Sequence, residues 1–184
     1  MTIGDLWFLA EEASQRAEQV YQRLRERHTG VLEFTRRRRV PRSRFRTLAR
    51  RVVDSGAPFG AHTVVYREGG ELLLVRHEGV DRWVVPGGEV GANEDLREAA
   101  ERELAEEAGV EADYEGLAMA TRVEFAAAEH AAWGVLPVYA ARAVTTEPTV
   151  DDPDGEISDA QWFADPPPDT RDREELLAWR DRRF

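Results

Sequence analysis

The segment from Gly87 to Val110 constrains this chain most, because it joins a helical apolar pattern to a dense group of carboxylates. A helix is predicted over residues 93–108. Its buried face is marked by apolar residues at helical spacing: Leu96, Ala100, Leu104 and Ala108. The same segment carries Glu103, Glu106 and Glu107, and like charges at helical spacing repel by about a few tenths of a kcal/mol per pair. This repulsion predicts that a positive charge is held beside them.

The three glutamates stand at positions i, i+3 and i+4, so their side chains emerge on one helix face with Cβ atoms about 5–6 Å apart. Oxygen ligands at that separation suit Mg²⁺, or alternatively Mn²⁺, which are hard cations that also bind substrate phosphates. Arg102 precedes the first glutamate and can hold its carboxylate in a bidentate pose. A solvated acidic helix face is the alternative interpretation of the glutamates taken alone.

The complete spacing resembles the Nudix box. The matching positions are Gly88, then Glu94 after five residues, Arg102-Glu103-Leu104 after seven more, Glu106-Glu107 after one, and Gly109-Val110 after one. The resemblance covers about residues 58–165. It implies an α+β fold, namely a Nudix-type α/β/α sandwich with a mixed β-sheet. It also implies hydrolysis of a nucleoside diphosphate linked to another group.

Two positions of the segment depart from the family pattern. Gly91 stands where the family usually has Glu, and Asn93 stands where it usually has Gly. Asn tolerates left-handed backbone angles better than most residues, so Asn93 is expected to replace the glycine. Neither position belongs to the implied metal ligands.

The resemblance assigns metal-binding roles by position. Glu103, Glu106 and Glu107 correspond to the ligands of Mg²⁺. The backbone carbonyl of Gly88, or that of Gly87, corresponds to a further ligand, since glycine lets the backbone turn sharply and approach a metal closely.

Catalytic roles follow from the same resemblance. Arg102 corresponds to the residue that orients Glu103, and Glu94 corresponds to a supporting acid. The general base is Glu103 in some relatives and an acid from a loop outside the box in others. Glu156 is the first candidate for that loop acid, although solvation of an acidic loop is the alternative. Two weaker candidates are Glu124 and Glu129.

Two aromatic residues are candidates for substrate binding. Phe125 and Trp133 could line a nucleobase pocket, and packing within predicted strands is the alternative for each. Three histidines, His62, His77 and His130, lack the paired spacing of a histidine metal site and are interpreted as structural or surface residues.

The charge divides the chain near Ser55. Residues 1–55 carry 13 Arg and 7 acidic residues, a balance of +6, whereas residues 56–184 carry 12 Arg and 29 acidic residues, a balance of −17, and the two sum to the net charge of −11. We therefore expect an Arg-rich α-helical N-terminal extension over residues 1–55. Residues 56–184 are expected to form a Nudix hydrolase domain that includes a C-terminal helix.

The extension contains two predicted helices. The first has an apolar stripe that could pair with a second chain in a homodimer: Leu6, Leu9, Ala13, Ala17, Val20 and Leu24. The second starts near Pro41, and the residues Arg36–Arg51 around it are strongly basic. They could bind phosphate or nucleic acid. A cationic face docked on the acidic domain is favoured instead, because no aromatic residues are interleaved for base stacking.

The composition narrows the classes of protein to which this chain can belong. Cysteine is absent, which excludes disulfides and thiolate chemistry. No long apolar run or cationic leader is visible, so we expect a soluble, cytoplasmic protein without a membrane partner. All 25 basic residues are Arg. Together with the acidic surplus this indicates a halophile, with a GC-rich genome as the alternative explanation.

The predicted function is Mg²⁺-dependent hydrolysis of a phosphoanhydride bond in a small nucleotide: a nucleoside triphosphate, ADP-ribose or a sugar nucleotide. One alternative is an RNA 5′-end pyrophosphohydrolase whose basic arm follows the RNA backbone. A second alternative is a non-catalytic nucleotide-sensing Nudix domain. Sensors often lose box carboxylates, and this chain keeps them all. Residues that mark narrower subfamilies are absent, which leaves the substrate open.

Overall fold

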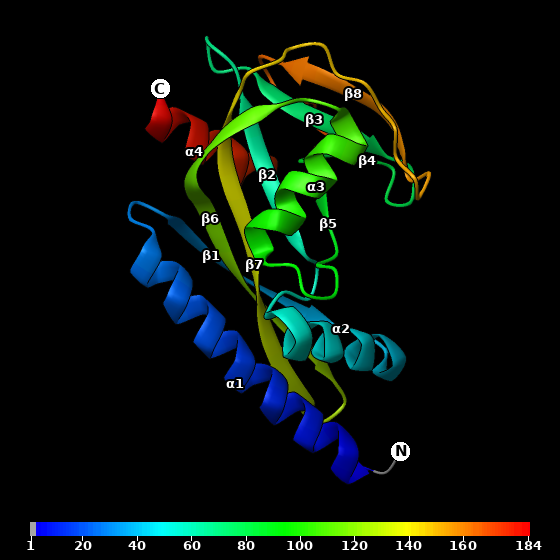
Figure 1. The fold of residues 1–184 in the computed structure, drawn as a ribbon. Coiled ribbons are helices and arrows are strands. Elements are labelled where there is room, and N and C mark those ends of the chain that lie inside the picture. Colours follow the sequence, from blue (N-terminus) through cyan, green and yellow to red (C-terminus); the bar gives the residue numbers. More distant parts are fainter. Residues whose placement is uncertain (1–2) are drawn as a thin grey trace.

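The structure is a computed structural model that describes residues 3–184. These residues form four helices and eight strands (Figure 1). The helices are α1 (Ile3–Arg27), α2 (Arg42–Ser55), α3 (Leu96–Ala108) and α4 (Arg173–Arg183). The strands are β1 (Leu32–Arg39), β2 (Ala61–Tyr66), β3 (Leu72–His77), β4 (Arg82–Val84), β5 (Gly87–Gly88), β6 (Ala112–Ala127), β7 (His130–Ala143) and β8 (Ile157–Phe163).

The strands join one mixed sheet. The order is β1-β6-β7-β2-β3-β4, with β5 paired to β2 and β8 paired to β3. The long β6–β7 hairpin is antiparallel, whereas β1 runs parallel to β6 and β2 runs parallel to β7. Parallel neighbours need long crossover connections, and α2 and α3 lie within the segments that supply them.

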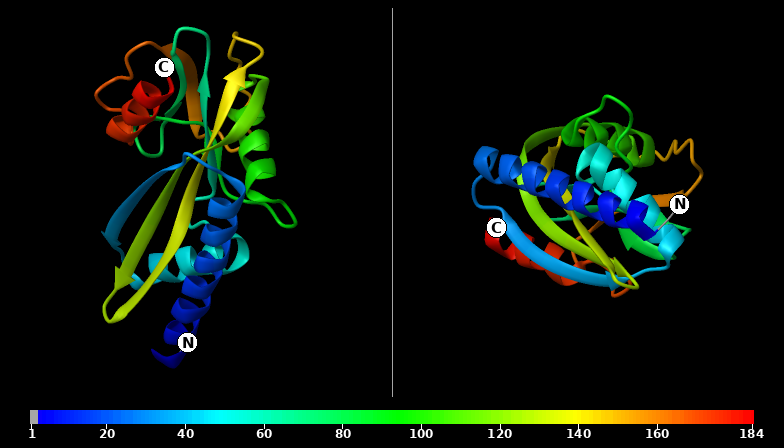
Figure 2. Two further views of the ribbon diagram at one scale, coloured as in Figure 1. Left: turned by 90° about the vertical axis from the view of Figure 1, so that its left-hand side faces the viewer. Right: turned by 90° about the horizontal axis from the view of Figure 1, so that it is seen from below.

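Helices cover both faces of this sheet, because successive residues of a strand point to opposite faces. Val65 of β2 belongs to an apolar cluster with Leu104 of α3, whereas the adjacent Val64 belongs to a different cluster with Leu176 and Trp179 of α4. Figure 2 shows α3 and α4 on opposite sides of the strands. The predicted α+β fold, an α/β/α sandwich with a mixed sheet, is confirmed.

Helix α1 lies along the β6–β7 hairpin and contacts α2 and β7 (Figure 1). Most of its apolar stripe is buried inside the chain: Leu6, Ala10, Ala13, Ala17, Val20 and Leu24. Tyr21 on the same helix packs edge-on against Trp133 of β7, with ring centroids 5.9 Å apart. The stripe that we expected to be available for a homodimer is therefore occupied by the chain's own sheet.

One part of the N-terminal extension is not helical. The arginine run lies in β1, which pairs with β6 from Leu32↔Met119 to Arg39↔Ala126. Because successive side chains of a strand point to opposite faces, Arg36 and Arg38 lie on one face of β1 and Arg37 lies on the other. The sequence predicted two helices in an α-helical extension and no strand between them. Residues 32–39 form a strand because a distant strand, β6, provides their hydrogen-bonding partner.

Ion pairs link the basic extension to the acidic remainder of the chain. Arg37 contacts Glu124 at 2.7 Å, and Arg42 contacts Glu129 at 3.5 Å. Arg51 pairs with Glu89. These pairs match the favoured interpretation of a cationic face docked on acidic residues. Among residues 3–184, no helix is long and apolar enough to cross a membrane.

We predict that Phe45→Ala destabilises the protein by about 3–5 kcal/mol, as expected for an aromatic residue deleted from a core. Phe45 of α2 is fully buried and packs against Phe125, with ring centroids 5.4 Å apart. Phe8 is 68% exposed, so Phe8→Ala should change stability by less than about 0.5 kcal/mol. Urea unfolding followed by circular dichroism measures both. Similar losses in the two variants would contradict the packing described for α2.

Candidate active site

Local sequence fixes the position of helix α3. Asp95 is its N-cap: the side chain accepts a hydrogen bond from the Glu98 amide, and the Glu98 side chain accepts one from the Asp95 amide. This capping box satisfies two free amides of the first turn. The helix therefore begins at Leu96, slightly later than predicted. Asn93 in the preceding loop has φ 63°, the left-handed conformation expected of a residue that replaces glycine.

Arg102 connects the carboxylates along the helix. Its Nε and Nη2 donate to the two oxygens of Glu94 at 2.8 and 3.0 Å. Its Nη1 donates to Glu103 at 2.8 Å and to Glu106 at 3.2 Å. These hydrogen bonds lower the pKa of Glu94, whose second oxygen also accepts from the amide of Gly91 at 2.7 Å. Arg102 therefore fixes the pose of three carboxylates at once.

Glu107 is the most buried carboxylate of the group. Only 7% of the residue is exposed, and its Oε2 accepts a hydrogen bond from the Gly87 amide at 2.8 Å. Burial raises the pKa of Glu107 to about 8, against the effect of that amide, and the nearby Glu103, Asp152 and Glu156 raise it further. Burial likewise raises the pKa of Glu103, although Arg102 opposes the change. Both environments favour an added positive charge.

Two glycines let the backbone reach the carboxylates. A Cβ atom on Gly60, which has φ 76°, would lie 1.6 Å from the carbonyl oxygen of Gly88. A Cβ atom on Gly88 would lie 2.6 Å from the Glu103 carboxyl carbon. Only glycine permits both approaches, so the Gly88 backbone and the Glu103 carboxylate share one small space.

A pocket of about 590 Å³ opens beside this space. We call five of its acidic lining residues the acidic wall: Glu103 and Glu107 from α3, and Asp152, Asp154 and Glu156 from the loop before β8. Two further acidic lining residues, Glu89 and Asp172, pair with Arg51 and Arg36. Its basic wall contains Arg36, Arg38, Arg44, Arg51 and Arg171. Apolar side chains line the pocket as well: Phe59, Val80, Val84, Val85, Leu136 and Val138. A pocket of this size with convergent polar groups is typical of a small-molecule site.

The carboxylates that face the pocket suit a hard divalent cation. Oxygen donors are the ligands that Mg²⁺ and Mn²⁺ prefer, and the buried Glu107 lacks a basic side-chain partner among residues 3–184. Over the same residues, no three His, Cys, Asp or Glu side chains are already gathered closely enough to hold a metal ion. Glu103 and Glu106 bond to Arg102 instead. The donor set fits the cation, and binding would require these side chains to exchange partners.

The structure brings together some predicted site residues and separates others. Glu103, Glu107, Gly88 and Glu156 line the pocket, with Arg102 and Glu94 hydrogen-bonded behind Glu103. Glu106 bonds to Arg102 and is not among the lining residues. The two weaker base candidates lie in ion pairs outside the pocket: Glu124 with Arg37 and Arg122, and Glu129 with Arg42.

The prediction that Phe125 and Trp133 line a nucleobase pocket needs correction. Phe125 is 1% exposed and packs on Phe45, and Trp133 is 7% exposed and packs on Tyr21. Both rings belong to the core beneath the N-terminal helices, and neither lines the pocket. They face away from the site because α1 and α2, rather than substrate, cover this end of the β6–β7 hairpin.

Sequence reasoning missed several pocket residues. Asp152 and Asp154 come from the same acidic loop as Glu156, so the composition of that loop was the available signal. Arg38 and Arg44 lie in the basic segment Arg36–Arg51, for which phosphate binding was the less favoured interpretation, and Arg171 comes from the segment before α4. No local spacing could have added Arg171 to them, because only the fold brings it to the same pocket.

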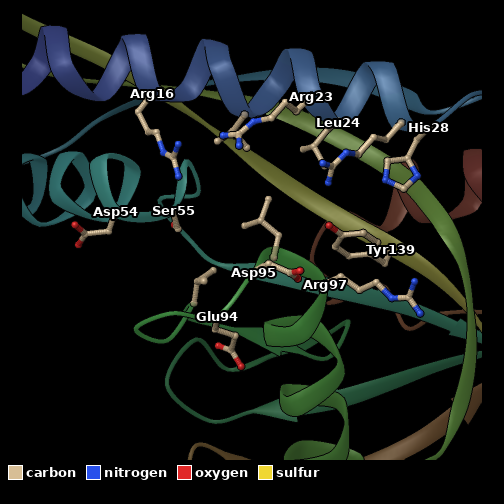
Figure 3. A pocket seen from close by; sticks show the side chains of 14 residues that line it. Arg16, Arg23, Leu24, His28, Asp54, Ser55, Glu94, Asp95, Arg97 and Tyr139 are labelled. Atoms are coloured by element: carbon tan, nitrogen blue, oxygen red, sulfur yellow. The ribbon is translucent and has the colours of Figure 1, made fainter.

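A second pocket of about 410 Å³ lies between α1 and the start of α3. Figure 3 shows Arg16 and Arg23 of α1 across from Asp95 and Arg97, with Tyr139 on the sheet behind them. Glu94 lies on its border, but Glu103, Glu106 and Glu107 do not line it. The first pocket is therefore the candidate active site.

We predict that Glu107→Gln removes a pH dependence of stability in metal-free protein. Because the folded-state pKa is raised to about 8 from 4.5, the stability linked to protonated Glu107 is complete below pH 4.5 and is lost as pH rises through 8. We expect wild type to lose about 1–3 kcal/mol more than the variant between pH 5 and 9. Urea unfolding in EDTA measures the difference, with the exposed Glu101→Gln as control. Identical slopes for wild type and Glu107→Gln would contradict the described burial.

The NUDIX domain family model matches residues 56–179. A Bacillus subtilis (strain 168) protein named "Putative 8-oxo-dGTP diphosphatase" is 43% identical over 53 residues, which are 29% of this chain and 36% of that protein. The chain thus matches only about a third of that relative's length.

Two solved structures are among those similar to the chain. A MutT NUDIX hydrolase from Burkholderia pseudomallei is 29% identical with a TM-score of 0.48, covering 65% of this chain and 93% of that one. A NUDIX-family hydrolase from Clostridium perfringens is 17% identical with a TM-score of 0.49, covering 66% and 92%. Since the family model spans more than half of the chain and includes α3 with its carboxylates, the chain belongs to the Nudix family of hydrolases.

Proposed function

We propose that this Nudix hydrolase cleaves a phosphoanhydride bond in a nucleotide, in a reaction that depends on Mg²⁺. The observation that carries the proposal is the joint placement of Glu103, Glu107 and the Gly88 backbone on one wall of the pocket. This wall concentrates negative charge where a nucleotide would also bring negative charge. A cation between them would offset this repulsion.

The cation would be held by Glu103, Glu107 and the Gly88 carbonyl, with Glu106 joining when it leaves Arg102. When bound, it would supply electrostatic neutralisation of the pyrophosphate and acidify water. Mn²⁺ is the alternative ion, as its ligand preferences are similar. Arg102 and Glu94 would keep Glu103 in position through the hydrogen bonds described above.

Glu156 is our candidate for the general base. It lines the pocket from the loop before β8, and its Oε2 lies 3.4 Å from His77 Nε2. Unlike Glu103, it has no arginine partner within residues 3–184. Water would attack phosphorus and pass its proton to Glu156 while the anhydride P–O bond breaks. The products are two phosphorylated fragments.

We predict that Glu106→Gln and Glu107→Gln each lower kcat/KM by at least about 100-fold, because each removes a charge that would hold the cation. The assay measures phosphate release with Mg²⁺ from a nucleotide panel that includes 8-oxo-dGTP, the compound in the name of the Bacillus subtilis relative. Glu156→Gln should lower kcat with little change in KM.

The matched control is Glu101→Gln on the same helix. Glu101 is exposed and pairs with Arg97 at 2.7 Å, away from the pocket. The activity of Glu101→Gln should stay within about threefold of wild type. Full activity of Glu106→Gln and Glu107→Gln would remove the α3 carboxylates from the reaction, and nucleotide binding without any turnover by wild type would favour a sensor.

A further inference from the structure

Three arginines of the active-site pocket lack a carboxylate partner. Arg38 comes from β1, Arg44 from α2 and Arg171 from the segment before α4. Within residues 3–184, the structure records no side-chain hydrogen bond or ion pair for any of the three. By contrast, Arg36 bonds to Asp172 and Glu175 at 2.5 and 2.7 Å. We call Arg38, Arg44 and Arg171 the arginine wall.

The arginine wall lacks carboxylate partners within residues 3–184 even though the chain has an acidic surplus. The protein has 36 acidic residues against 25 arginines, so carboxylates to neutralise the wall are abundant. Arg171 is half-buried, and burial lowers its pKa. Its neighbours Arg38, Arg82 and Arg36 lower that pKa further, against the opposing effect of Asp172. Guanidinium groups held together without anions are expected to recruit one from solution.

An aromatic ring fixes two of the guanidinium groups. The Arg38 and Arg44 guanidinium carbons lie 5.5 and 6.0 Å from the centroid of the Phe59 ring. Such cation–π contacts orient arginine without neutralising it. Their hydrogen-bond donors therefore remain available to a ligand.

The wall also lies close to the reacting end of the pocket. Phe59 is followed by Gly60, whose α-carbon abuts the Gly88 carbonyl, the candidate metal ligand. The arginines and the carboxylates thus line one pocket of about 590 Å³. A polyphosphate chain reaching from one wall to the other would satisfy both.

We propose that the arginine wall is an anion subsite that binds a phosphate group other than the two joined by the cleaved anhydride, so that the enzyme selects nucleotides with three or more phosphates. This inference rests on the proposed function for the cleaved bond. It distinguishes among the substrates left open by the sequence: nucleoside triphosphates should be preferred over nucleoside diphosphate sugars, whose distal group is neutral. It also gives the arginine run of the N-terminal extension a role.

The first test compares two substrates in single variants. Arg38→Gln, Arg44→Gln and Arg171→Gln should each lower kcat/KM for a nucleoside triphosphate by about 10–100-fold, since each removes a charged hydrogen-bond donor. Activity on a nucleoside diphosphate sugar such as UDP-glucose should change by less than about threefold. The matched control is Arg39→Gln, because Arg39 is exposed on the same strand and does not line the pocket.

The second test needs no turnover. Binding of inorganic tripolyphosphate to the intact protein is measured by calorimetry in EDTA. Under this condition the acidic wall holds no divalent cation that could bind the phosphates. Wild type and Arg39→Gln should bind, and each wall variant should bind at least about tenfold more weakly. Thermal unfolding verifies folding, and Arg171→Gln should be at least as stable as wild type because it removes a half-buried unpaired charge.

The outcomes separate the two proposals. Equal losses on both substrates, or tripolyphosphate binding unaffected by the wall variants, would overturn the subsite while leaving the hydrolase intact. The wall variants could lose tripolyphosphate binding while the wild type hydrolyses no nucleotide. That result would support the anion subsite and reject the proposed reaction. Loss of cleavage confined to triphosphate-ended RNA, with mononucleotides unaffected, would assign the wall to an RNA partner and contradict the subsite as proposed.

Discussion

The desolvated carboxylate of Glu107 is the constraint around which the site is built. Its one recorded hydrogen bond comes from the Gly87 amide, and burial holds its pKa near 8. A buried carboxylate without a basic partner destabilises a fold. Here it persists where α3, β5 and the loop before β8 meet, which is explained if a cation completes the site. The glycines at 60 and 88 serve the same arrangement by bringing backbone oxygen beside carboxylate oxygen.

The arginines of the N-terminal extension that line the pocket fall into two groups. Arg36 and Arg51 are neutralised by acidic residues and dock the extension. Within residues 3–184 the arginine wall has no carboxylate partner, and it lines the same pocket as the acidic wall. A site divided in this way attracts a cation to one side and a polyanion to the other, and low-dielectric walls strengthen both attractions. The predicted domain boundary near residue 55 and the predicted halophilic source both stay predictions.

The sequence predicted those features that depend on local spacing. The stripe of α3, the contacts of Arg102 and the left-handed Asn93 all follow from residues within one short segment. Features that depend on distant partners were missed. Strand β1 forms because β6 offers it a parallel edge, and Phe125 is buried because α2 covers it. The arginine wall requires β1, α2 and the segment before α4 to meet, which no pattern within one segment can reveal.

Crystals grown with Mn²⁺ and a non-hydrolysable nucleoside triphosphate test the central claim most directly, because anomalous diffraction locates manganese without ambiguity. We expect a manganese peak bonded to oxygens of Glu103 and Glu107, with the nucleotide's phosphates between that ion and the arginine wall. Manganese bound elsewhere, with Glu103 and Glu107 contacting neither ion nor nucleotide, would contradict the account.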